Sequence, residues 1–319
     1  MRKFTKITAI LLSILMLTVF VVGCASQNKE VIESDKLKTE KVVETLSFPL
    51  KLIDDAGREI EVQEEPERII SLAPSNTETL FALGLGDKVV GVTDFCDYPE
   101  EAKSKDKVGG FSDPNIEKII ELKPDLVLAT GMHGEILKQL EDVNVVVFVV
   151  DPKNIKDVIE SIETVGKLTG QADASKNLIA DMNEKIDGVK TKGANLSDGQ
   201  RPLVYYEVWN DPIMTVGPGT LIYEIIEMAG GENIAADSKE EYPQLSVEVL
   251  IEKDPQIIIA PKGSMGEPGA VKERKGWENI SAVQDGKVYV VDENLLVRAG
   301  PRIIDGLMEV AKILHPELY

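Results

Sequence analysis

Two stretches of the chain repeat one another: IEKIIELKPDLVLA at Ile116–Ala129 and VEVLIEKDPQIIIA at Val247–Ala260. They align without a gap, and Pro124 falls opposite Pro255. In each, an amphipathic run stops at the proline, which cannot continue a helix, and a short aliphatic run typical of a buried strand follows. The repeat predicts a helix–strand unit present twice, and therefore two similar lobes.

The rest of the chain extends this pattern. Short β-branched runs alternate with helical segments, which predicts βαβ units and mainly parallel sheets. The expected strands are Ile69–Ala73, Leu126–Ala129, Val145–Val150 and Leu203–Val208, and a helix is expected over Thr77–Leu83. Phe48–Val62 alternates apolar and polar residues around Asp54–Gly57, which predicts a β-hairpin. The fold class is therefore α/β.

A long helix is expected between the two halves. Leu178, Met182, Ile186 and Val189 fall three or four residues apart on one stripe of Ala172–Lys192. We therefore predict two similar parallel-sheet lobes joined by one long, rigid α-helix, with a ligand cleft between them. The expected boundaries are residues 46–170 for the first lobe, 171–195 for the interlobe helix and 196–319 for the second lobe.

The N-terminus has the layout of an export signal. Basic residues precede the apolar run Ile7–Val22, which is shorter than a usual membrane span and ends just before Gly23 and Cys24. This end resembles a bacterial lipobox, so residues 1–23 are expected to be removed and Cys24 to be acylated. Residues 24–45 are polar and are expected to be a flexible tether. The protein should then lie on the outer face of the cell membrane, held by its lipid.

Composition excludes several classes of partner and site. The formal net charge is −20, and no lysine- or arginine-rich tract is present, so nucleic acid is not an expected partner. Lipidation of Cys24 would leave Cys96 as the only thiol, so no intramolecular disulfide is expected. Only His133 and His315 could give imidazole ligands, so no resident metal and no cofactor are predicted.

Several motifs together resemble the helical-backbone class of ABC-importer binding proteins. They are Pro66–Glu78, Asp97–Pro99, Leu122–Val127 and Gly300–Leu307. The resemblance covers about Phe48 to the end. It implies a lipoprotein that carries vitamin B12, an iron-siderophore complex or haem between two lobes. Its partner would be an ABC permease dimer with ATPase subunits, and the motifs are most similar to those of cobalamin-binding members. We therefore expect a monomer with a corrinoid ligand.

Candidate ligand contacts come from segments that follow strands, because open α/β sheets bind ligands beyond the carboxyl ends of their strands. The expected start of a helix near Ser75 and Asn76 would direct free N–H groups to the cleft, with one of these two side chains as its cap. The resemblance implies that Ser75, Tyr98, Phe111, Trp209 and Arg298 lie where the ligand ring would be packed and its amide groups recognised. The full set of expected ligand contacts is Ser75, Asn76, Tyr98, Phe111, Met132, Trp209, Asn210, Tyr242, Asn294 and Arg298.

Two other cargoes stay open. Haem would use axial ligation, and Met132-His133 follows a predicted strand at a suitable place, although a solvent-facing loop histidine is the simpler interpretation. Iron siderophores call for clustered basic residues, and the matched segments offer mainly Arg298, with Arg302 expected to start a helix.

A secreted enzyme is the remote alternative. Gly84-Leu85-Gly86 resembles part of a dinucleotide-binding fingerprint, but it closes a helix and lacks the third glycine. No nucleophile elbow, P-loop or paired-cysteine motif is present, so no enzymatic activity is predicted.

The duplicated unit also predicts a docking pair. Glu117 and Glu248 occupy equivalent places near the starts of the two helices, where the helix dipole favours a carboxylate. By resemblance, they match the glutamates that dock on arginines of the two permease subunits.

Overall fold

The computed structural model describes residues 47–262 and 268–319. The predicted signal peptide, Cys24 and the tether therefore lie outside the described residues. Within the described part of the chain, no helix is long and apolar enough to cross a membrane.

The N-terminal lobe is built on a five-stranded parallel sheet with strand order β5-β4-β3-β6-β7. Its strands are β3 (Ile69–Ser71), β4 (Val89–Val92), β5 (Asp106–Lys107), β6 (Leu126–Ala129) and β7 (Val147–Val149). Its helices are α2 (Pro74–Ala82), α3 (Ile116–Glu121), α4 (Gly134–Glu141) and α5 (Ile155–Leu168). All residues of the central strands β3 and β6 are buried, as expected for a sheet covered on both faces.

The C-terminal lobe repeats this plan with four parallel strands in the order β11-β8-β12-β13. Its strands are β8 (Leu203–Tyr206), β11 (Glu232–Asn233), β12 (Ile257–Lys262) and β13 (Val288–Asp292). Its helices are α7 (Leu221–Met228), α8 (Val247–Lys253), α9 (Ser281–Gln284), α10 (Asn294–Val297) and α11 (Ile303–Leu314). A small antiparallel pair, β9 (Trp209–Asn210) and β10 (Ile213–Met214), follows β8. The predicted fold class, α/β with two similar parallel-sheet lobes, is confirmed.

The sequence repeat is a structural repeat. Helix α3 leads to β6 and helix α8 leads to β12, each strand next to the central strand of its lobe, β3 or β8. Asn115 and Ser246 cap the two helices, each accepting a hydrogen bond from the third helical N–H. Lys123 and Asp254 both have φ of 48°, at equivalent positions just before the two prolines. This left-handed turn lets each chain reverse from helix to strand.

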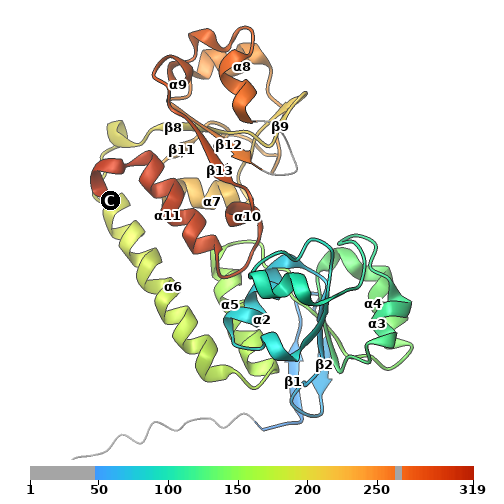
Figure 1. Ribbon diagram of the computed structural model, residues 1–319. Helices are drawn as coiled ribbons and strands as arrows, with labels where there is room; N and C mark the ends of the chain where they lie inside the picture. The colour runs from blue at the N-terminus through green and yellow to red at the C-terminus, as the bar shows by residue number, and fades with distance from the viewer. Residues whose placement is uncertain (1–46, 263–267) are drawn as a thin grey trace, which may run out of the picture. The chain divides into compact units, whose positions relative to one another are not determined.

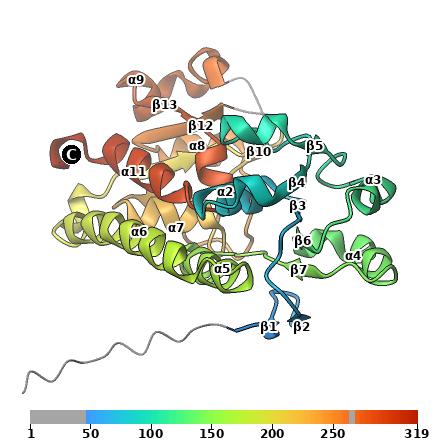
Figure 2. The same ribbon diagram turned by 60° about the horizontal axis from the view of Figure 1, so that its bottom comes forward.

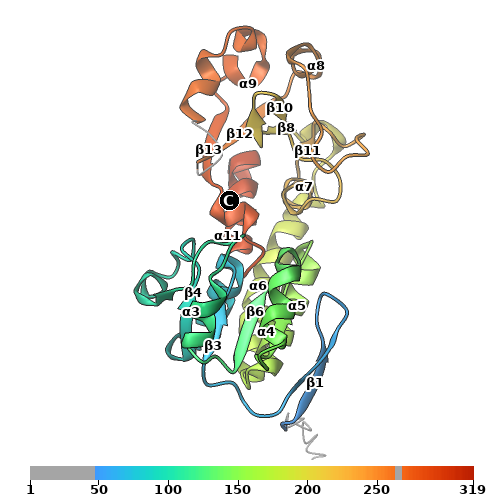
Figure 3. The same cartoon turned by 90° about the vertical axis from the view of Figure 1, so that its right-hand side faces the viewer.

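A 22-residue helix, α6 (Ala172–Gly193), joins the lobes, as the stripe of apolar residues predicts. Figures 1 and 3 show it running from the N-terminal lobe to the C-terminal lobe. It packs against α5 at one end and against α7 and α11 at the other, and Figure 2 shows α5 and α6 as adjacent ribbons. Met182, Ile186 and Val189 are buried in a hydrophobic cluster that includes residues of both sheets. At about 1.5 Å per residue, α6 spans roughly 33 Å.

The expected cap of the first cleft helix is wrong. Helix α2 begins at Pro74 rather than Thr77, its cap residue is Ala73, and no side chain caps it. Proline fits the first helical position because its fixed φ suits the helix and its missing N–H is not needed there. Ser75 and Asn76 therefore lie inside the first turn, and their capping role is lost.

The predicted hairpin forms from β1 (Leu50–Ile53) and β2 (Glu59–Val62) and is held on the N-terminal lobe by Asp54. The Asp54 carboxylate accepts hydrogen bonds from the Arg58 side chain at 2.9 Å and from the Val149 backbone N–H at 3.1 Å. Arg58 also bonds Glu141 and the Val147 carbonyl. Burial pushes the pKa of Asp54 up, but these hydrogen bonds outweigh it and hold the pKa below its ordinary value of 3.8.

Asp54→Ala is expected to lower the free energy of unfolding by about 2–4 kcal/mol, because it leaves buried donors without an acceptor. Since the folded-state pKa of Asp54 is depressed, its contribution is present above pH 3.8 and is lost as the pH falls below that value. Urea unfolding at pH 7 and at pH 3 measures both effects. An equal difference between wild type and variant at the two pH values would contradict the pH dependence.

Candidate functional site

A cavity of about 850 Å³, here called the cleft cavity, lies beyond the carboxyl ends of the N-terminal strands and against the segment that follows β13. Residues of both lobes line it. They are Ala73, Pro74, Ser75, Phe95, Phe111, Ser112, Thr130, Gly131, Met132, Val150, Asp151, Pro152, Lys153, Glu293, Asn294, Val297, Arg298 and Ala299. Its place agrees with the rule that open α/β sheets bind ligands beyond their strand ends.

The two lobes touch beside the cleft cavity, at Ser75 and Gly300. A Cβ on Gly300 would lie 3.0 Å from the Ser75 carbonyl oxygen, closer than side chains normally approach. Glycine therefore permits the start of α11 to lie against the first turn of α2. The Gly300-Pro301-Arg302 segment thus forms part of the contact between the two lobes.

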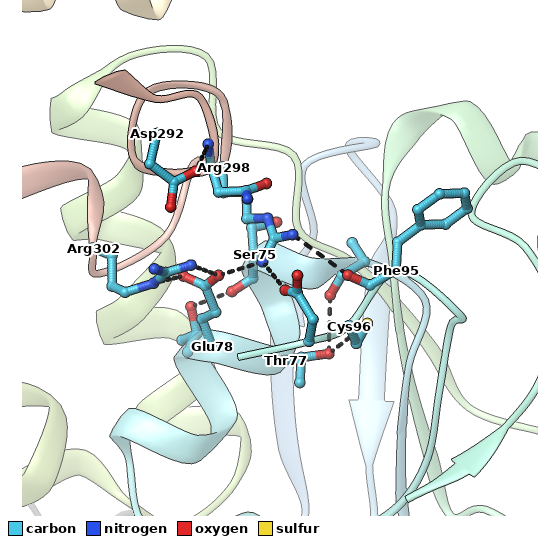
Figure 4. A network of polar contacts seen from close by, with 12 residues as sticks. Ser75, Thr77, Glu78, Phe95, Cys96, Asp292, Arg298 and Arg302 are labelled. Carbon is cyan, nitrogen blue, oxygen red and sulfur yellow. Dashed lines mark hydrogen bonds and ion pairs between the residues drawn. The ribbon is translucent and has the colours of Figure 1, made fainter. Parts of the chain in front are cut away.

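One buried carboxylate links the lobes at this contact. Glu78, on α2, has a side chain only 1% exposed and accepts hydrogen bonds from two arginines of the C-terminal lobe. Arg298 Nη1 lies 3.0 Å from Glu78 Oε1, and Arg302 Nε lies 2.9 Å from Glu78 Oε2. Figure 4 shows both guanidinium groups converging on this one side chain. Arg302 is the N-cap residue of α11, in keeping with its expected place at a helix start, but its side chain also joins this network.

Arg298 has a second carboxylate partner, Asp97, at 2.7 Å. Burial pushes the pKa of Asp97 up, but the hydrogen bond and charge of Arg298 outweigh it and hold that pKa below its ordinary value. Arg302 stacks over the ring of Tyr98 at 3.8 Å from its centroid. Tyr98 is 46% exposed and does not line the cleft cavity. Its observed contact is therefore a cation–π contact with Arg302.

The loop that carries Phe95 and Asp97 is held in place by contacts of Cys96, the residue between them. Cys96 is buried, and its sulfur lies 3.1 Å from Thr77 Oγ1 (Figure 4). Thr77 Oγ1 also bonds the Ser71 hydroxyl at 2.8 Å. Lys107 Nζ donates to the Cys96 carbonyl at 3.3 Å. These contacts fix the loop, so that Phe95 is presented to the cleft cavity with 60% of its surface exposed.

His133 is not a solvent-facing loop residue, and that expectation is wrong. It is 1% exposed, and both ring nitrogens already have partners. Nδ1 lies 3.0 Å from the Thr130 backbone N–H, and Nε2 lies 2.7 Å from the Phe111 carbonyl oxygen. Its role is structural: it closes the turn after β6 and ties the Phe111 loop to it. Met132 beside it is 59% exposed and lines the cleft cavity.

Half of the expected ligand contacts gather in the cleft cavity. They are Ser75, Phe111, Met132, Asn294 and Arg298. Asn76 lies behind this wall, 2% exposed, with its amide donating to the Ala129 carbonyl at 3.2 Å. That contact ties α2 to the end of β6.

Three other expected contacts, Trp209, Asn210 and Tyr242, lie on or beside the antiparallel pair β9–β10 of the C-terminal lobe, outside the cleft cavity. Trp209 pairs with Met214, which also bridges to Gln244. Trp209 is 39% exposed and Tyr242 is 50% exposed, while Asn210 is exposed next to the tryptophan. The layer follows β8, at the end of the strand that corresponds to β3. It therefore occupies the position in the second lobe that the cavity wall occupies in the first.

Glu117 and Glu248 are both exposed, in the first turns of α3 and α8. Neither carboxylate has an ion-pair partner among the described residues. Hydrogen bonds from its own backbone N–H and from the Ser246 hydroxyl hold the pKa of Glu248 below its ordinary value. The two anions thus stand at equivalent positions of the two lobes.

Sequence reasoning missed part of the cavity wall and its main electrostatic contact. The missed lining residues include Phe95, Ser112, Asp151 and Lys153. The segment after β7 could have been found, because Asp151-Pro152-Lys153 directly follows a predicted strand. The pairing of Glu78 with Arg298 and Arg302 had no local signal, because the partners lie 220 and 224 residues apart.

Known proteins are similar to this chain in sequence and in fold. The family model described as periplasmic binding protein matches residues 69–295. An uncharacterized ABC transporter substrate-binding lipoprotein, YvrC of Bacillus subtilis, is 35% identical over 313 residues, covering 96% of each chain.

Two solved structures also share the fold. The vitamin B12 binding protein BtuF of Vibrio cholerae has 31% identity and a TM-score of 0.67, over 79% of this chain and 97% of that chain. The haem-binding protein RhuT of Roseiflexus has 25% identity and a TM-score of 0.70, over 79% of this chain and 99% of that chain. With a family match over most of its length, the chain belongs to the periplasmic binding protein family.

Proposed function

We propose that this protein is the substrate-binding component of an ABC importer and that its ligand is a corrinoid such as vitamin B12. The cleft cavity carries this proposal. It has a volume of about 850 Å³, lies between elements of both lobes, and combines apolar residues with neutral polar and charged side chains on its walls. The similarity to YvrC supports the transporter class, and the similarity to BtuF supports the corrinoid.

The wall chemistry suits a large ring with amides on its rim. Phe95, Phe111 and Val297 offer apolar surface to the flat faces of such a ring. Ser75 and Asn294 offer a hydroxyl and an amide, which can exchange hydrogen bonds with uncharged amide groups. Sites of this kind, mostly apolar with a few directed polar groups, are typical for small-molecule ligands.

Haem is the second candidate, because Met132 is exposed on the cavity wall and thioether sulfur is an axial ligand of haem iron in some proteins. The similarity to RhuT favours it as well. Ligation by His133, however, would require both of its hydrogen bonds to break and a buried ring to turn out. Of the Met132-His133 pair, Met132 alone can therefore ligate haem iron without rearrangement, and the corrinoid remains the better proposal.

Visible absorption of the purified protein tests the cargo. Cyanocobalamin and haemin are added separately, unbound ligand is removed on a desalting column, and the retained ligand is quantified. We expect retention of about one cobalamin per chain, as for a single-site binder. Retained haem with a Soret band that Met132→Ala shifts would support haem instead, and retention of neither ligand would refute the corrinoid.

We further propose that acylated Cys24 holds the protein on the outer face of the membrane. Cys24→Ala is then expected to release most of the protein from the membrane fraction, because a lipid anchor and not the folded lobes supplies the attachment. Fractionation followed by immunoblotting measures this, with Cys96→Ala as the matched control. An unchanged membrane fraction for Cys24→Ala would contradict the lipobox.

A further inference from the structure

The cations of the cleft cavity already have carboxylate partners. Among the described lining residues, the lysines and arginines are Lys153 and Arg298. Lys153 Nζ lies 2.6 Å from Asp151 Oδ2, on the cavity wall itself. Arg298 Nη1 lies 3.0 Å from Glu78 and 2.7 Å from Asp97. A ligand that enters the cavity therefore meets guanidinium and ammonium groups whose charges are neutralised.

Glu78 is the central member of this arrangement. Its side chain is 1% exposed, whereas those of Arg298 and Arg302 are 11% and 17% exposed. A carboxylate in such a place is strongly desolvated, and it is stable only while its cationic partners stay beside it. Because its partners hold both of its oxygens, Glu78 cannot swing away to release Arg298 to a ligand.

The consequence for ligands depends on their charge. A carboxylate brought to Arg298 would lie beside Asp97, whose side chain is 52% exposed, and beside the fixed charge of Glu78. Like charges at short range in a partly desolvated site repel strongly. An uncharged amide can instead accept a hydrogen bond from Arg298 without displacing either partner.

We propose that Glu78 is a specificity-determining residue that makes the cleft cavity select ligands with uncharged, amide-bearing rims and reject those with carboxylates. This rests on the proposed function in one respect, namely that the ligand occupies the cleft cavity. Glu78 acts through Arg298 and does not itself line the cavity, so it is a positioning residue.

Glu78→Gln tests this with a matched pair of probes, cyanocobalamin and cyanocobalamin monocarboxylates, in which one rim amide is hydrolysed. We expect the wild-type protein to bind at least one monocarboxylate about tenfold more weakly than cyanocobalamin. In Glu78→Gln, the ratio of the two dissociation constants should fall to about threefold or less, because Asp97 is then the remaining carboxylate partner of Arg298. The dissociation constant for cyanocobalamin itself should change by less than about threefold.

Two controls separate specificity from structure. Glu227→Gln makes the same substitution at another arginine-paired glutamate, which bonds Arg201 in the C-terminal lobe and does not line the cavity. It should leave the ratio unchanged. Asp97→Asn removes the exposed partner of Arg298 and should lower the ratio in the same direction, and it serves if Glu78→Gln does not fold.

The outcomes are distinct. An unchanged ratio in folded Glu78→Gln and Asp97→Asn overturns the proposal, as does an equal loss of affinity for every probe, which would show a purely structural role. If the wild-type protein binds no cobalamin, the corrinoid function fails, and haemin then supplies the test. Haemin carries two carboxylates, so Glu78→Gln should bind it about tenfold more tightly than wild type, and equal binding would overturn the role of Glu78.

Discussion

Replacing both Glu117 and Glu248 by lysine is expected to abolish ligand uptake, to below about one tenth of the wild-type rate, while ligand binding stays near wild type. The two glutamates stand in the first turns of α3 and α8, which are equivalent helices of the two lobes. We propose that they dock on basic residues of the two permease subunits. Lysine there would turn attraction into repulsion at both contacts.

The structure makes this pair suitable for a two-fold partner. Both side chains are exposed, and each helix has its own side-chain cap, Asn115 or Ser246, so neither glutamate is needed to cap its helix. Neither residue lines the cleft cavity. A pseudo-symmetric pair of anions is what an assembly of two like subunits can engage at once.

Uptake by vesicles reconstituted with the transporter, measured beside equilibrium binding, tests the docking role. Glu184→Lys/Asp187→Lys is the matched control, because it makes the same change of charge at two exposed positions of α6. Its uptake should remain near wild type. Wild-type uptake by the Glu117→Lys/Glu248→Lys protein would refute docking, and lost ligand binding would place the pair in the binding site.

The fold was predictable because its signals are local. Proline at 124 and 255 stops two helices, and an aliphatic run after each forms a strand beside the central strand of its lobe. The apolar stripe of α6 likewise follows from helical periodicity, and the structure buries Met182, Ile186 and Val189 as that stripe requires. Such patterns need only neighbouring residues to be read.

The site was predictable only in part because its decisive contacts join distant segments. The rule that ligands bind beyond strand ends located Phe111, Met132 and Arg298 on the cavity wall. It could not show that Arg298 is already paired with Glu78, or that His133 turns inward to bond the Phe111 carbonyl. Those outcomes depend on tertiary packing, and a residue type alone does not state its partner.

Trp209→Ala is expected to weaken corrinoid binding by about 1–3 kcal/mol, which is roughly 5- to 150-fold in the dissociation constant. The indole is 39% exposed on the layer that follows β8, and Nε1 donates to the Asp211 carbonyl at 2.8 Å. This hydrogen bond fixes the ring, so the aromatic face is ordered before the ligand arrives. We propose that Trp209 supplies an aromatic contact to the ligand from the C-terminal lobe, as Phe111 does from the N-terminal lobe.

Calorimetric titration with cyanocobalamin measures the effect, and urea unfolding checks the fold. Because Trp209 is partly exposed, its removal should cost less than about 1 kcal/mol of unfolding free energy, well below the cost for a buried aromatic residue. Tyr319→Ala is the matched control, since Tyr319 is 37% exposed and stacks on Lys192 rather than on any residue of the cleft cavity. Unchanged affinity in a folded Trp209→Ala protein would show that the ligand contacts the N-terminal lobe and the segment after β13 without this ring. A loss of affinity in both variants would indicate a general effect of removing aromatic surface, whereas a loss in Trp209→Ala alone would place the corrinoid between the two lobes, against aromatic side chains of each.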